Sequence, residues 1–285
     1  MAEKIVFTKM HGAGNDYIYV NTMVQEIADP AACARLWSDR HTGIGADGLV
    51  LIGAASVADA DFSMRIFNAD GSEAMMCGNA ARCIGKYLHE KGLTRKTDIG
   101  LQTRSGVKRL HVNLDAERCV ESVTVDMQAP RFDAEEQYRP LVAGASADAL
   151  PEGFFVSMGN PHYVVFTNDL TDSHVKGEGH RIEHHAAFPE RTNVEFVSQL
   201  LDGRLRVRVW ERGSGITMAC GTGACAVAVA AIRAGRAREM VRVVMDGGEL
   251  TVRWAEHNSH VYLSGPAETV FEGEIALPDT ARKDV

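Results

Sequence analysis

Two stretches of the chain place apolar residues at helical spacing. In residues 78–92, GNAARCIGKYLHEKG, apolar side chains recur at i, i+3, i+4, i+7 and i+8 from Ala80, and Gly92 follows as a typical helix stop. In residues 221–235, GTGACAVAVAAIRAG, apolar residues occupy every face before Gly235. The first pattern predicts an amphipathic helix, and the second predicts a fully buried one.

Alternating apolar and polar residues follow each of these stretches. Residues 109–125, RLHVNLDAERCVESVTV, alternate on both sides of a turn at 115–117. Residues 241–254, VRVVMDGGELTVRW, alternate around a turn at 246–248, and HVYLSGP follows at 260–266. Period-2 patterning with short turns predicts antiparallel strand pairs rather than alternating β-α-β units.

The two helical stretches belong to an internal repeat. Residues 65–81, RIFNADGSEAMMCGNAA, align without a gap on 208–224, RVWERGSGITMACGTGA, at an offset of 143 residues. Upstream, GNDYIYV at 14–20 resembles GNPHYVVF at 159–166, at an offset of 145 to 146. The identities of the first alignment are Arg65 and Arg208, Met75 and Met218, Cys77 and Cys220, Gly78 and Gly221, and Ala81 and Ala224.

The repeat predicts an α+β fold of two pseudo-symmetric halves, each a mostly antiparallel, barrel-like sheet wrapped around a central helix. A chain of 285 residues also suits two domains better than one core. We place the halves at residues 1–130 and 131–266. We expect the C-terminal strand, ETVFEGEIAL within 267–285, to return to the first half.

Composition restricts the kinds of partner. The net charge of −8 argues against nucleic acid, and the arginines of RLRVRVW at 204–210 suit a solvated strand face. No stretch approaches the ~20 apolar residues needed to cross a bilayer. The N-terminal MAEKIVFTKMHGAG lacks the apolar core of a signal peptide. These features predict a cytoplasmic protein that acts on a small molecule, without a nucleic-acid or membrane partner.

Six cysteines occur, and none forms C-x-x-C, so we expect free thiols and no structural metal site. Cys77 and Cys220 stand at the same point of the repeat, each before Gly and the start of a helix. A helix N-terminus carries partial positive charge and free N–H groups, so it predicts a lowered thiol pKa and a carboxylate site. The other four suit packing positions: Cys33, Cys83, Cys119 and Cys225.

A pair of thiols, one from each half, suits inversion at a carbon atom. One thiolate removes a proton and the other thiol returns a proton from the opposite face. This chemistry needs no metal and no cofactor.

At these residues the sequence resembles the diaminopimelate epimerase family, cofactor-independent isomerases of lysine and peptidoglycan-precursor synthesis. The resemblance covers nearly the whole chain, and the two cysteine motifs with GNPH between them carry most of its specificity. It also implies a fold of two pseudo-symmetric halves. The matching motifs are HGAGNDY, GIGADG, FNADGSEAMMCGNAARC, GNPH, RTNVEFV and WERGSGITMACGTGACA.

The resemblance implies roles for individual residues. Cys77 and Cys220 would be the acid/base pair, with Cys220 accepting the proton and Cys77 donating one in the LL-to-meso direction. His162 and Glu211 would tune the thiol pKa values. The residues implied to bind the substrate's carboxylate and amino groups are Asn15, Asn68, Gly78, Asn79, Asn160, Asn193, Glu211, Arg212, Gly221 and Thr222.

The chain departs from the family pattern at three positions. Gly48 stands where glutamine is frequent, so that side-chain contact is missing. Ala80 replaces a frequent glycine, and Ile216 stands where an acidic residue is frequent. None of the three removes a charge that the chemistry needs.

Other motifs fit less well. The glycines of GIGADG, 43–48, match G-x-G-x-x-G, but the segment before them is helix-like and the one after is strand-like, the reverse of a dinucleotide site. Gly85-Lys86 lacks the remainder of a phosphate-binding loop. The histidines of HRIEHH, 180–185, lack the H-E-x-x-H spacing, and we expect them in a solvated turn.

Two alternative functions stay open. One is a two-cysteine racemase or epimerase of the proline and hydroxyproline type, which usually has His where this chain has Asn79. The other is a thiol redox sensor or a binding module, in which the two sulfurs would form a disulfide. A homodimer is compatible with the sequence but does not follow from it.

Overall fold

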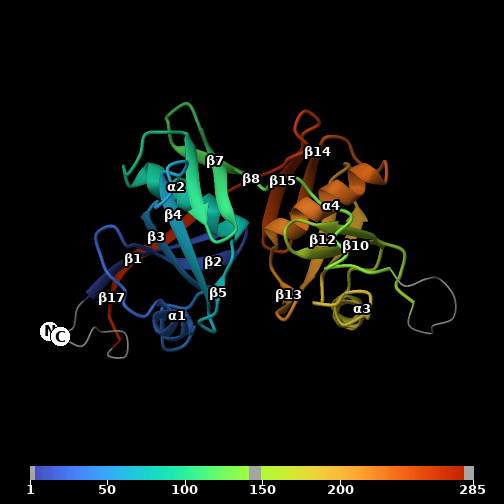
Figure 1. Ribbon diagram of the computed structural model, residues 1–285, viewed down its shortest axis with the longest axis horizontal. Coiled ribbons are helices and arrows are strands. Elements are labelled where there is room, and N and C mark those ends of the chain that lie inside the picture. The colour runs from blue at the N-terminus through green and yellow to red at the C-terminus, as the bar shows by residue number, and fades with distance from the viewer. Residues whose placement is uncertain (1–3, 141–148, 279–285) are drawn as a thin grey trace. The chain divides into compact units, whose positions relative to one another are not determined.

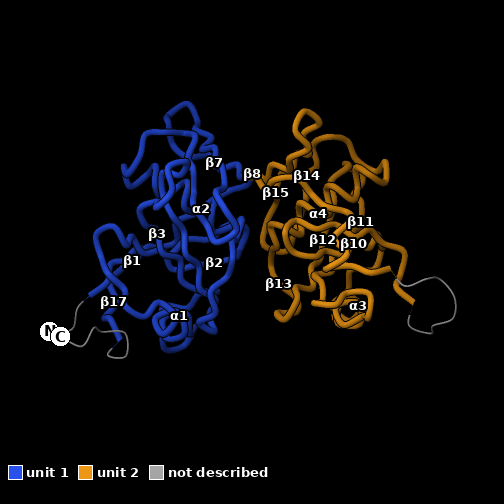
Figure 2. The backbone as a smooth tube through the Cα atoms, in the orientation of Figure 1, with its two compact units in different colours: residues 1–125, 265–285 blue, residues 126–264 orange. Residues whose placement is uncertain are grey.

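The computed structural model describes residues 4–140 and 149–278, which form two compact units. Unit 1 is Met1–Val125 with Gly265–Val285, and unit 2 is Asp126–Ser264 (Figure 2). Of the C-terminal segment 267–285, residues 279–285 lie outside the described residues.

The elements of each unit follow one order (Figure 1). Those of unit 1 are β1 (Lys4–Gly12), β2 (Asn15–Asn21), α1 (Pro30–Ser38), β3 (Gly48–Ala54), β4 (Phe62–Asn68), β5 (Glu73–Ala74), α2 (Gly78–Glu90), β6 (Asp98–Thr103), β7 (Gly106–Leu114), β8 (Val120–Asp126) and β17 (Glu268–Ala276). Those of unit 2 are β9 (Phe154–Ser157), β10 (Pro161–Phe166), α3 (Asp172–Glu183), β11 (Asn193–Gln199), β12 (Leu205–Glu211), β13 (Gly215–Thr217), α4 (Gly221–Arg233), β14 (Met240–Met245), β15 (Gly248–Trp254) and β16 (Val261–Gly265).

Strand pairing repeats along with the order. In unit 1, β2–β3 and β4–β6 are parallel, and in unit 2 the corresponding pairs β10–β11 and β12–β14 are parallel. The remaining strand pairs described within each unit are antiparallel. The predicted fold class, a mostly antiparallel sheet around a central helix in each half, is confirmed.

The central helices of the two units are α2 and α4. The first packs against β1, β2 and β7, and the second packs against strands β9, β10, β11, β14 and β15. Residues 223–231 of α4 are all buried, as its uniformly apolar sequence predicts. Both helices are followed by a glycine in the left-handed region, Gly92 at φ 67° and Gly235 at φ 68°, so the predicted stops are confirmed.

The outer helices α1 and α3 pack on other strands, α1 on β3 and β4, and α3 on β11, β12 and β13. The solvated turn expected for HRIEHH is wrong, because His180 lies in α3 and His184 caps its C-terminal end. The sequence of α3 is rich in charge and glycine, which hid its buried side. That side contributes Val175 and Ile182 to a core that includes Phe188 and Phe196.

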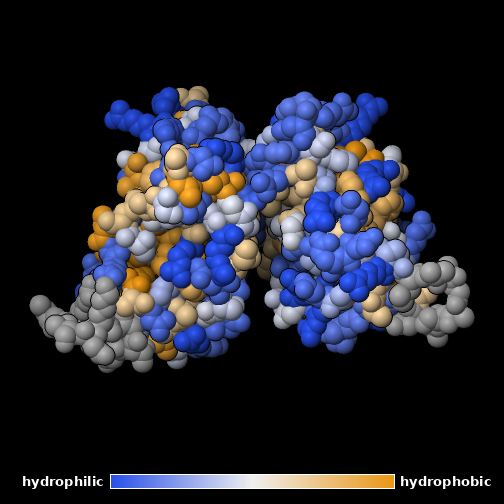
Figure 3. Space-filling model, in the orientation of Figure 1, coloured by the Kyte–Doolittle hydropathy of each residue, from blue (hydrophilic) through white to orange (hydrophobic). Residues whose placement is uncertain are grey.

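The last described strand, β17, pairs antiparallel with β1 from Lys4↔Ala276 to His11↔Glu268. Gly273 of β17 lies against the ring of Phe7, and an added Cβ atom would be 3.0 Å from the Cζ atom of that ring. Apolar side chains gather on the viewed face of unit 1 (Figure 3). The large apolar residues of β1 and β17 that are exposed are Val6, Val270 and Phe271. Among the described residues, no helix is both long enough and apolar enough to span a membrane.

Candidate functional site

A tight hairpin in unit 1 presents Asn15 to the start of α2. Ala13 and Gly14, at φ 55° and φ 79°, form the two-residue turn between β1 and β2, which requires positive φ at both positions. A Cβ atom on Gly12 would lie 3.2 Å from the backbone oxygen of Asn79. The missing side chain therefore lets the hairpin lie directly on the helix.

The first candidate thiol belongs to Cys77, the N-cap residue of α2, and it is half-buried. Its Sγ lies 3.5 Å from Oδ1 of Asn15. The same oxygen accepts a hydrogen bond from Nδ2 of Asn79 at 3.1 Å. Unit 1 thus brings together three of the predicted site residues at one helix N-terminus.

The second candidate thiol belongs to Cys220, the N-cap residue of α4, and it is only 8% exposed. Its Sγ accepts a hydrogen bond from the backbone N–H of Gly223 at 3.3 Å and lies 3.4 Å from Oγ1 of Thr222. These donors are those that a helix N-terminus offers to an anion.

The expected lowering of the thiol pKa is wrong for Cys220. Burial raises the pKa of this thiol well above its ordinary value, and the negative charges of Glu211 and Glu195 raise it further. The hydrogen bonds from Thr222 and Gly223 act in the opposite direction but do not prevail. In the protein without substrate, Cys220 is therefore a protonated thiol at neutral pH.

Glu211 is the last residue of β12, and Arg212 begins the loop that follows. Oε1 of Glu211 accepts a hydrogen bond from Thr217 at 2.5 Å. The backbone N–H of Arg212 donates to Oδ1 of Asn193 at 3.0 Å, and its guanidinium donates to the carbonyl of Glu190 at 2.9 Å. The buried Asn193 amide in turn donates to the carbonyl of Pro161 at 2.9 Å, which ties the loop to β10 and β11.

A buried pair lies beside the start of α4. Nδ1 of His162 and Oε1 of Glu195 are 2.7 Å apart, and both side chains are 0% exposed. Nε2 of His162 lies 3.2 Å from Oδ1 of Asn160, whose Nδ2 is 3.4 Å from Oγ1 of Thr222. Unit 2 thus joins His162, Asn160 and Thr222 to Cys220 by consecutive hydrogen bonds.

Asn68 is placed differently from the other predicted residues. It ends β4, and its Nδ2 donates to Oγ of Ser72 at 3.0 Å, closing the turn before β5. None of the hydrogen bonds described for unit 1 joins Asn68 to Cys77 directly. Its role in binding stays a prediction.

Sequence reasoning missed two acidic residues. Asp47 accepts a hydrogen bond from Nδ2 of Asn15 at 2.7 Å and so orients that amide toward Cys77. Glu195 was not singled out, although it is an acidic residue within the otherwise apolar run VEFV. A carboxylate at the centre of a buried strand is costly unless it is paired, and that cost was the available signal.

The three departures from the family pattern have structural settings. A Cβ atom on Gly48 would lie 2.0 Å from the carbonyl oxygen of Phe67, so no side chain fits there without a shift of the strands. Ala80 is fully buried in the first turn of α2. Ile216 packs against the core of unit 2 around α3.

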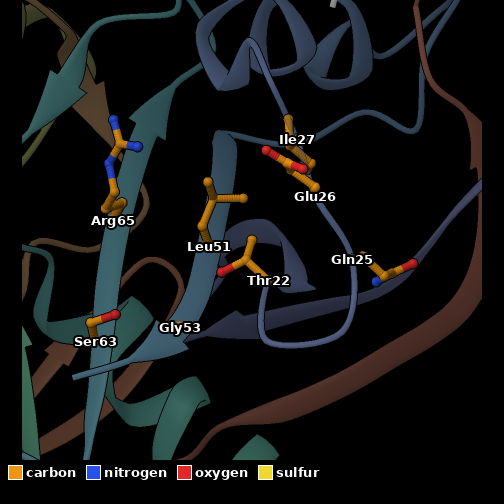
Figure 4. Close-up of a pocket in the computed structure, with 8 residues that line it drawn as sticks. All are labelled: Thr22, Gln25, Glu26, Ile27, Leu51, Gly53, Ser63 and Arg65. Atoms are coloured by element: carbon orange, nitrogen blue, oxygen red, sulfur yellow. The ribbon is translucent and has the colours of Figure 1, made fainter. Parts of the chain in front are cut away.

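A metal site and a surface pocket are the other kinds of functional site considered for the described residues. Within residues 4–140 and 149–278, no cluster of three or more His, Cys, Asp or Glu side chains is arranged to hold a metal ion. A shallow pocket in unit 1, lined by Thr22, Gln25, Glu26, Ile27, Leu51, Gly53, Ser63 and Arg65, includes no predicted site residue (Figure 4). Its Gln25 amide bonds the backbone of Val6, and its Arg65 bonds Glu73, so these groups serve the fold.

Comparison with known proteins gives the family. The sequence model of diaminopimelate epimerase matches residues 7–132 and 154–270. A diaminopimelate epimerase of Phocaeicola vulgatus is 56% identical over 283 residues, which cover 97% of this chain and 100% of the relative. The chain belongs to the diaminopimelate epimerase family. A more distant member, from Methanococcus maripaludis, is 46% identical over 95% of this chain and 99% of its own length.

Solved structures extend the likeness of fold beyond the diaminopimelate epimerase family. A hydroxyproline epimerase from Agrobacterium vitis superposes with a TM-score of 0.67 at 19% identity, covering 99% of this chain and 96% of that protein. A Bacillus anthracis protein of the PhzF phenazine-biosynthesis family superposes with a TM-score of 0.69 at 16% identity, covering 96% and 99%. At these identities the likeness concerns the fold alone.

Proposed function

We propose that this protein interconverts LL- and meso-2,6-diaminopimelate by inverting one α-carbon. One cysteine thiolate removes the α-proton, and a second cysteine thiol donates its own proton to the opposite face. Membership of the diaminopimelate epimerase family supports the substrate and the reaction class. The observation that carries the two-thiol mechanism is the position of Cys77 and Cys220, each at the N-cap of its unit's central helix.

In the LL-to-meso direction, the Cys220 thiolate accepts the α-proton and the Cys77 thiol gives its proton to the opposite face of the carbanion. The product state holds a Cys220 thiol and a Cys77 thiolate, so protons and charge balance. The reverse reaction exchanges the two roles. The N–H groups at the starts of α2 and α4 suit the reacting carboxylate, whose charge increases as the carbanion forms.

Because the pKa of Cys220 is raised, substrate binding has to favour the thiolate form of this residue. The negative charges of Glu211 and Glu195 disfavour the thiolate. A substrate α-ammonium beside Glu211 would offset this repulsion, so the thiolate would form when the substrate is present. The remaining polar groups, including Asn193 and Arg212, suit the distal amino and carboxylate groups.

Incubation of LL-diaminopimelate with the pure protein in deuterated water tests the proposal. We expect the meso isomer to appear with deuterium at one α-carbon. Exchange on proline or hydroxyproline but not on diaminopimelate would instead favour a racemase of that type. The absence of exchange on any amino acid would overturn the proposal and favour a thiol sensor or a binding module.

The protein's location and assembly are further parts of the proposal. The acidic composition and the expected substrate fit a cytoplasmic enzyme that binds neither nucleic acid nor membrane. A homodimer stays a prediction, and light scattering coupled to size exclusion measures it.

A further inference from the structure

The buried His162–Glu195 pair has no equivalent in the first unit. The parallel pairs Tyr17↔Gly48 and His162↔Asn193 occupy matching places in the two sheets, at a common offset of 145 residues. By the same offset, the counterparts of His162 and Glu195 are Tyr17 and Val50, which cannot form an ion pair. A requirement of the shared fold therefore does not explain the pair.

The cost of burial also calls for an explanation. His162 and Glu195 are both 0% exposed, and Oε2 of Glu195 is buried without a hydrogen-bond partner. Replacement of a buried ion pair by apolar residues of similar size is often neutral or stabilising, so stability alone does not account for this pair. Glu195 also lies close to α4. A Cβ atom added to Gly223 in the first turn of this helix would be 2.7 Å from Oε1 of Glu195.

The hydrogen bonds that lead away from Glu195 have one direction. A carboxylate only accepts, so Nδ1 of His162 donates to Glu195. Nε2 faces Oδ1 of Asn160 at 3.2 Å, so the ring bridges Glu195 and the Asn160 amide. Three groups connect Glu195 to Cys220 in sequence: the His162 imidazole, the Asn160 amide and the Thr222 hydroxyl. We call these three groups the donor relay.

The relay ends on sulfur. Nδ2 of Asn160 donates to Oγ1 of Thr222, which leaves the hydroxyl proton of Thr222 to point at Sγ of Cys220. A donor aimed at sulfur stabilises the thiolate relative to the thiol.

We propose that Glu195 is a positioning residue that directs the donor relay onto Cys220. The inference rests on the proposed role of Cys220 in proton transfer. Glu195 touches neither the reacting atoms nor the thiol by a hydrogen bond, and it acts through His162.

The sign of the effect follows from charge balance. The groups that act most on the Cys220 thiol are Glu211 from β12, Glu195 from β11, and the Thr222 hydroxyl and Gly223 N–H from α4. The negative charge of Glu195 raises the pKa of Cys220, whereas the Thr222 donor lowers it, so a test of the relay has to keep the charge. Glu195→Asp keeps the charge but shortens the side chain by one methylene group and withdraws the carboxylate from Nδ1 of His162, so the loss of an aimed donor decides the outcome.

The test is alkylation of Cys220 by iodoacetamide as a function of pH, measured by mass spectrometry of the Cys220 peptide. In Glu195→Asp we expect the whole profile to move to higher pH, so that alkylation is about tenfold slower at any pH below the midpoint. Thr222→Val should move the profile in the same direction. The double variant should match Thr222→Val alone, because both changes break one chain of bonds.

Glu183→Asp is the matched control. Glu183 is also a buried carboxylate of unit 2, but it bonds Nε1 of Trp210 and the N–H of Gly213 instead of the relay. Its variant should leave the Cys220 alkylation profile in place. NMR of the His162 ring adds a readout that a loss of packing elsewhere would not move, because the Nδ1–H signal that is hydrogen-bonded to Glu195 in the parent should shift in Glu195→Asp.

An unchanged profile in Glu195→Asp, a move to lower pH, or additive shifts in the double variant would overturn the inference. None of these readouts uses the substrate. If the parent protein fails to exchange protons on diaminopimelate, the proposed function fails, and alkylation and NMR still decide the relay.

Discussion

Cys77 and Cys220 hold equivalent places in the repeat but have different neighbours. In unit 1 the thiol lies beside the neutral amide of Asn15, and the fully buried Arg82 follows in the next turn of α2. In unit 2 two carboxylates act on the thiol. The residue that aligns with Arg82 at the offset of 143 is Cys225, so the second helix carries no cation there. The two sulfurs therefore have different electrostatic surroundings in the substrate-free protein.

Removal of either candidate thiol should abolish inversion. We expect Cys77→Ala and Cys220→Ala each to lower kcat for LL-to-meso conversion by at least about a thousandfold, because each removes one of two proton-transfer groups. Cys225→Ala is the control, since Cys225 is fully buried within α4 and should cost only about 1 kcal/mol of stability. Steady-state assays and thermal unfolding of all three variants check this. Turnover that survives Cys77→Ala would mean that the thiols are wrongly assigned.

The buried thiol of Cys83 should make stability depend on alkaline pH. Burial raises its pKa from 9.0 to about 11. As pH rises past about 9, the unfolded chain loses this proton before the folded chain does. The thiol's contribution to stability is therefore complete below pH 9 and declines by roughly 1.4 kcal/mol per pH unit up to about pH 11.

Denaturant unfolding of Cys83→Ala and its parent from pH 8 to 11 measures this effect. The stability advantage of the parent should shrink above pH 9. Cys119→Ala, which removes an exposed thiol, serves as the control and should show a constant difference. An advantage of Cys83 that does not change with pH would contradict the assigned shift.

At the scale of elements, the first turn of α4 lies against both Glu195 of β11 and the Cys220 thiol. Gly223 lies in the first turn, and an added Cβ would be 2.7 Å from Oε1 of Glu195 and 3.3 Å from Sγ of Cys220. A helix residue without a side chain is therefore required here for steric reasons, not for its backbone conformation.

Gly223→Ala should lower kcat by roughly tenfold or more and should destabilise unit 2 by about 1–3 kcal/mol, because it overpacks the buried pair. Gly177→Ala is the matched control on another helix of the same unit, where an added Cβ meets no atom within 4 Å. It should raise stability by roughly 0.5–1 kcal/mol, since alanine favours helix, and should leave kcat unchanged. Assays and thermal melts compare the two. A harmless Gly223→Ala would show that the helix start tolerates displacement.

The pattern of apolar and polar residues predicted those elements whose own sequence shows a clear apolar face. The apolar faces of α2 and α4, the stops at Gly92 and Gly235, and the strands that follow could all be derived from spacing. The helix α3 could not, because its buried side consists of few residues, including Val175 and Ile182, amid glycine and charge. Its stability comes from the aromatic core that it covers.

The positions of the candidate thiols were predictable, but the electrostatics of Cys220 were not. A helix N-terminus lowers a thiol pKa by local geometry, which the sequence displays. The opposing influence comes from burial and from Glu195, which lies on a strand 25 residues earlier in the chain. A pairing of that kind depends on tertiary structure, and periodicity carries no sign of it.

At the scale of the whole molecule, unit 1 is built from both ends of the described chain. Strand β17 covers one edge of β1 along nearly its full length. Unit 2 is continuous in sequence between the two segments of unit 1. The two units therefore differ in how far apart their parts lie along the chain.

Truncation after Gly265 tests this difference. We expect loss of β17 to leave the backbone groups of β1 unpaired and to expose Phe7 beside them, so that unit 1 loses cooperative unfolding. Hydrogen exchange should show loss of amide protection in residues 4–125, while residues 154–264 keep theirs. Substitution of Val270 by threonine, at an exposed site of the same strand, should leave protection unchanged. Equal loss in both units would mean that they do not fold separately.

The return of β17 also sets an order of events during synthesis on the ribosome. Unit 2 has its whole sequence available once Ser264 has emerged, whereas the sheet of unit 1 must wait for the segment that follows. Until then, a nascent β1 has an open edge that offers a docking place for chaperones or for neighbouring chains on the same message.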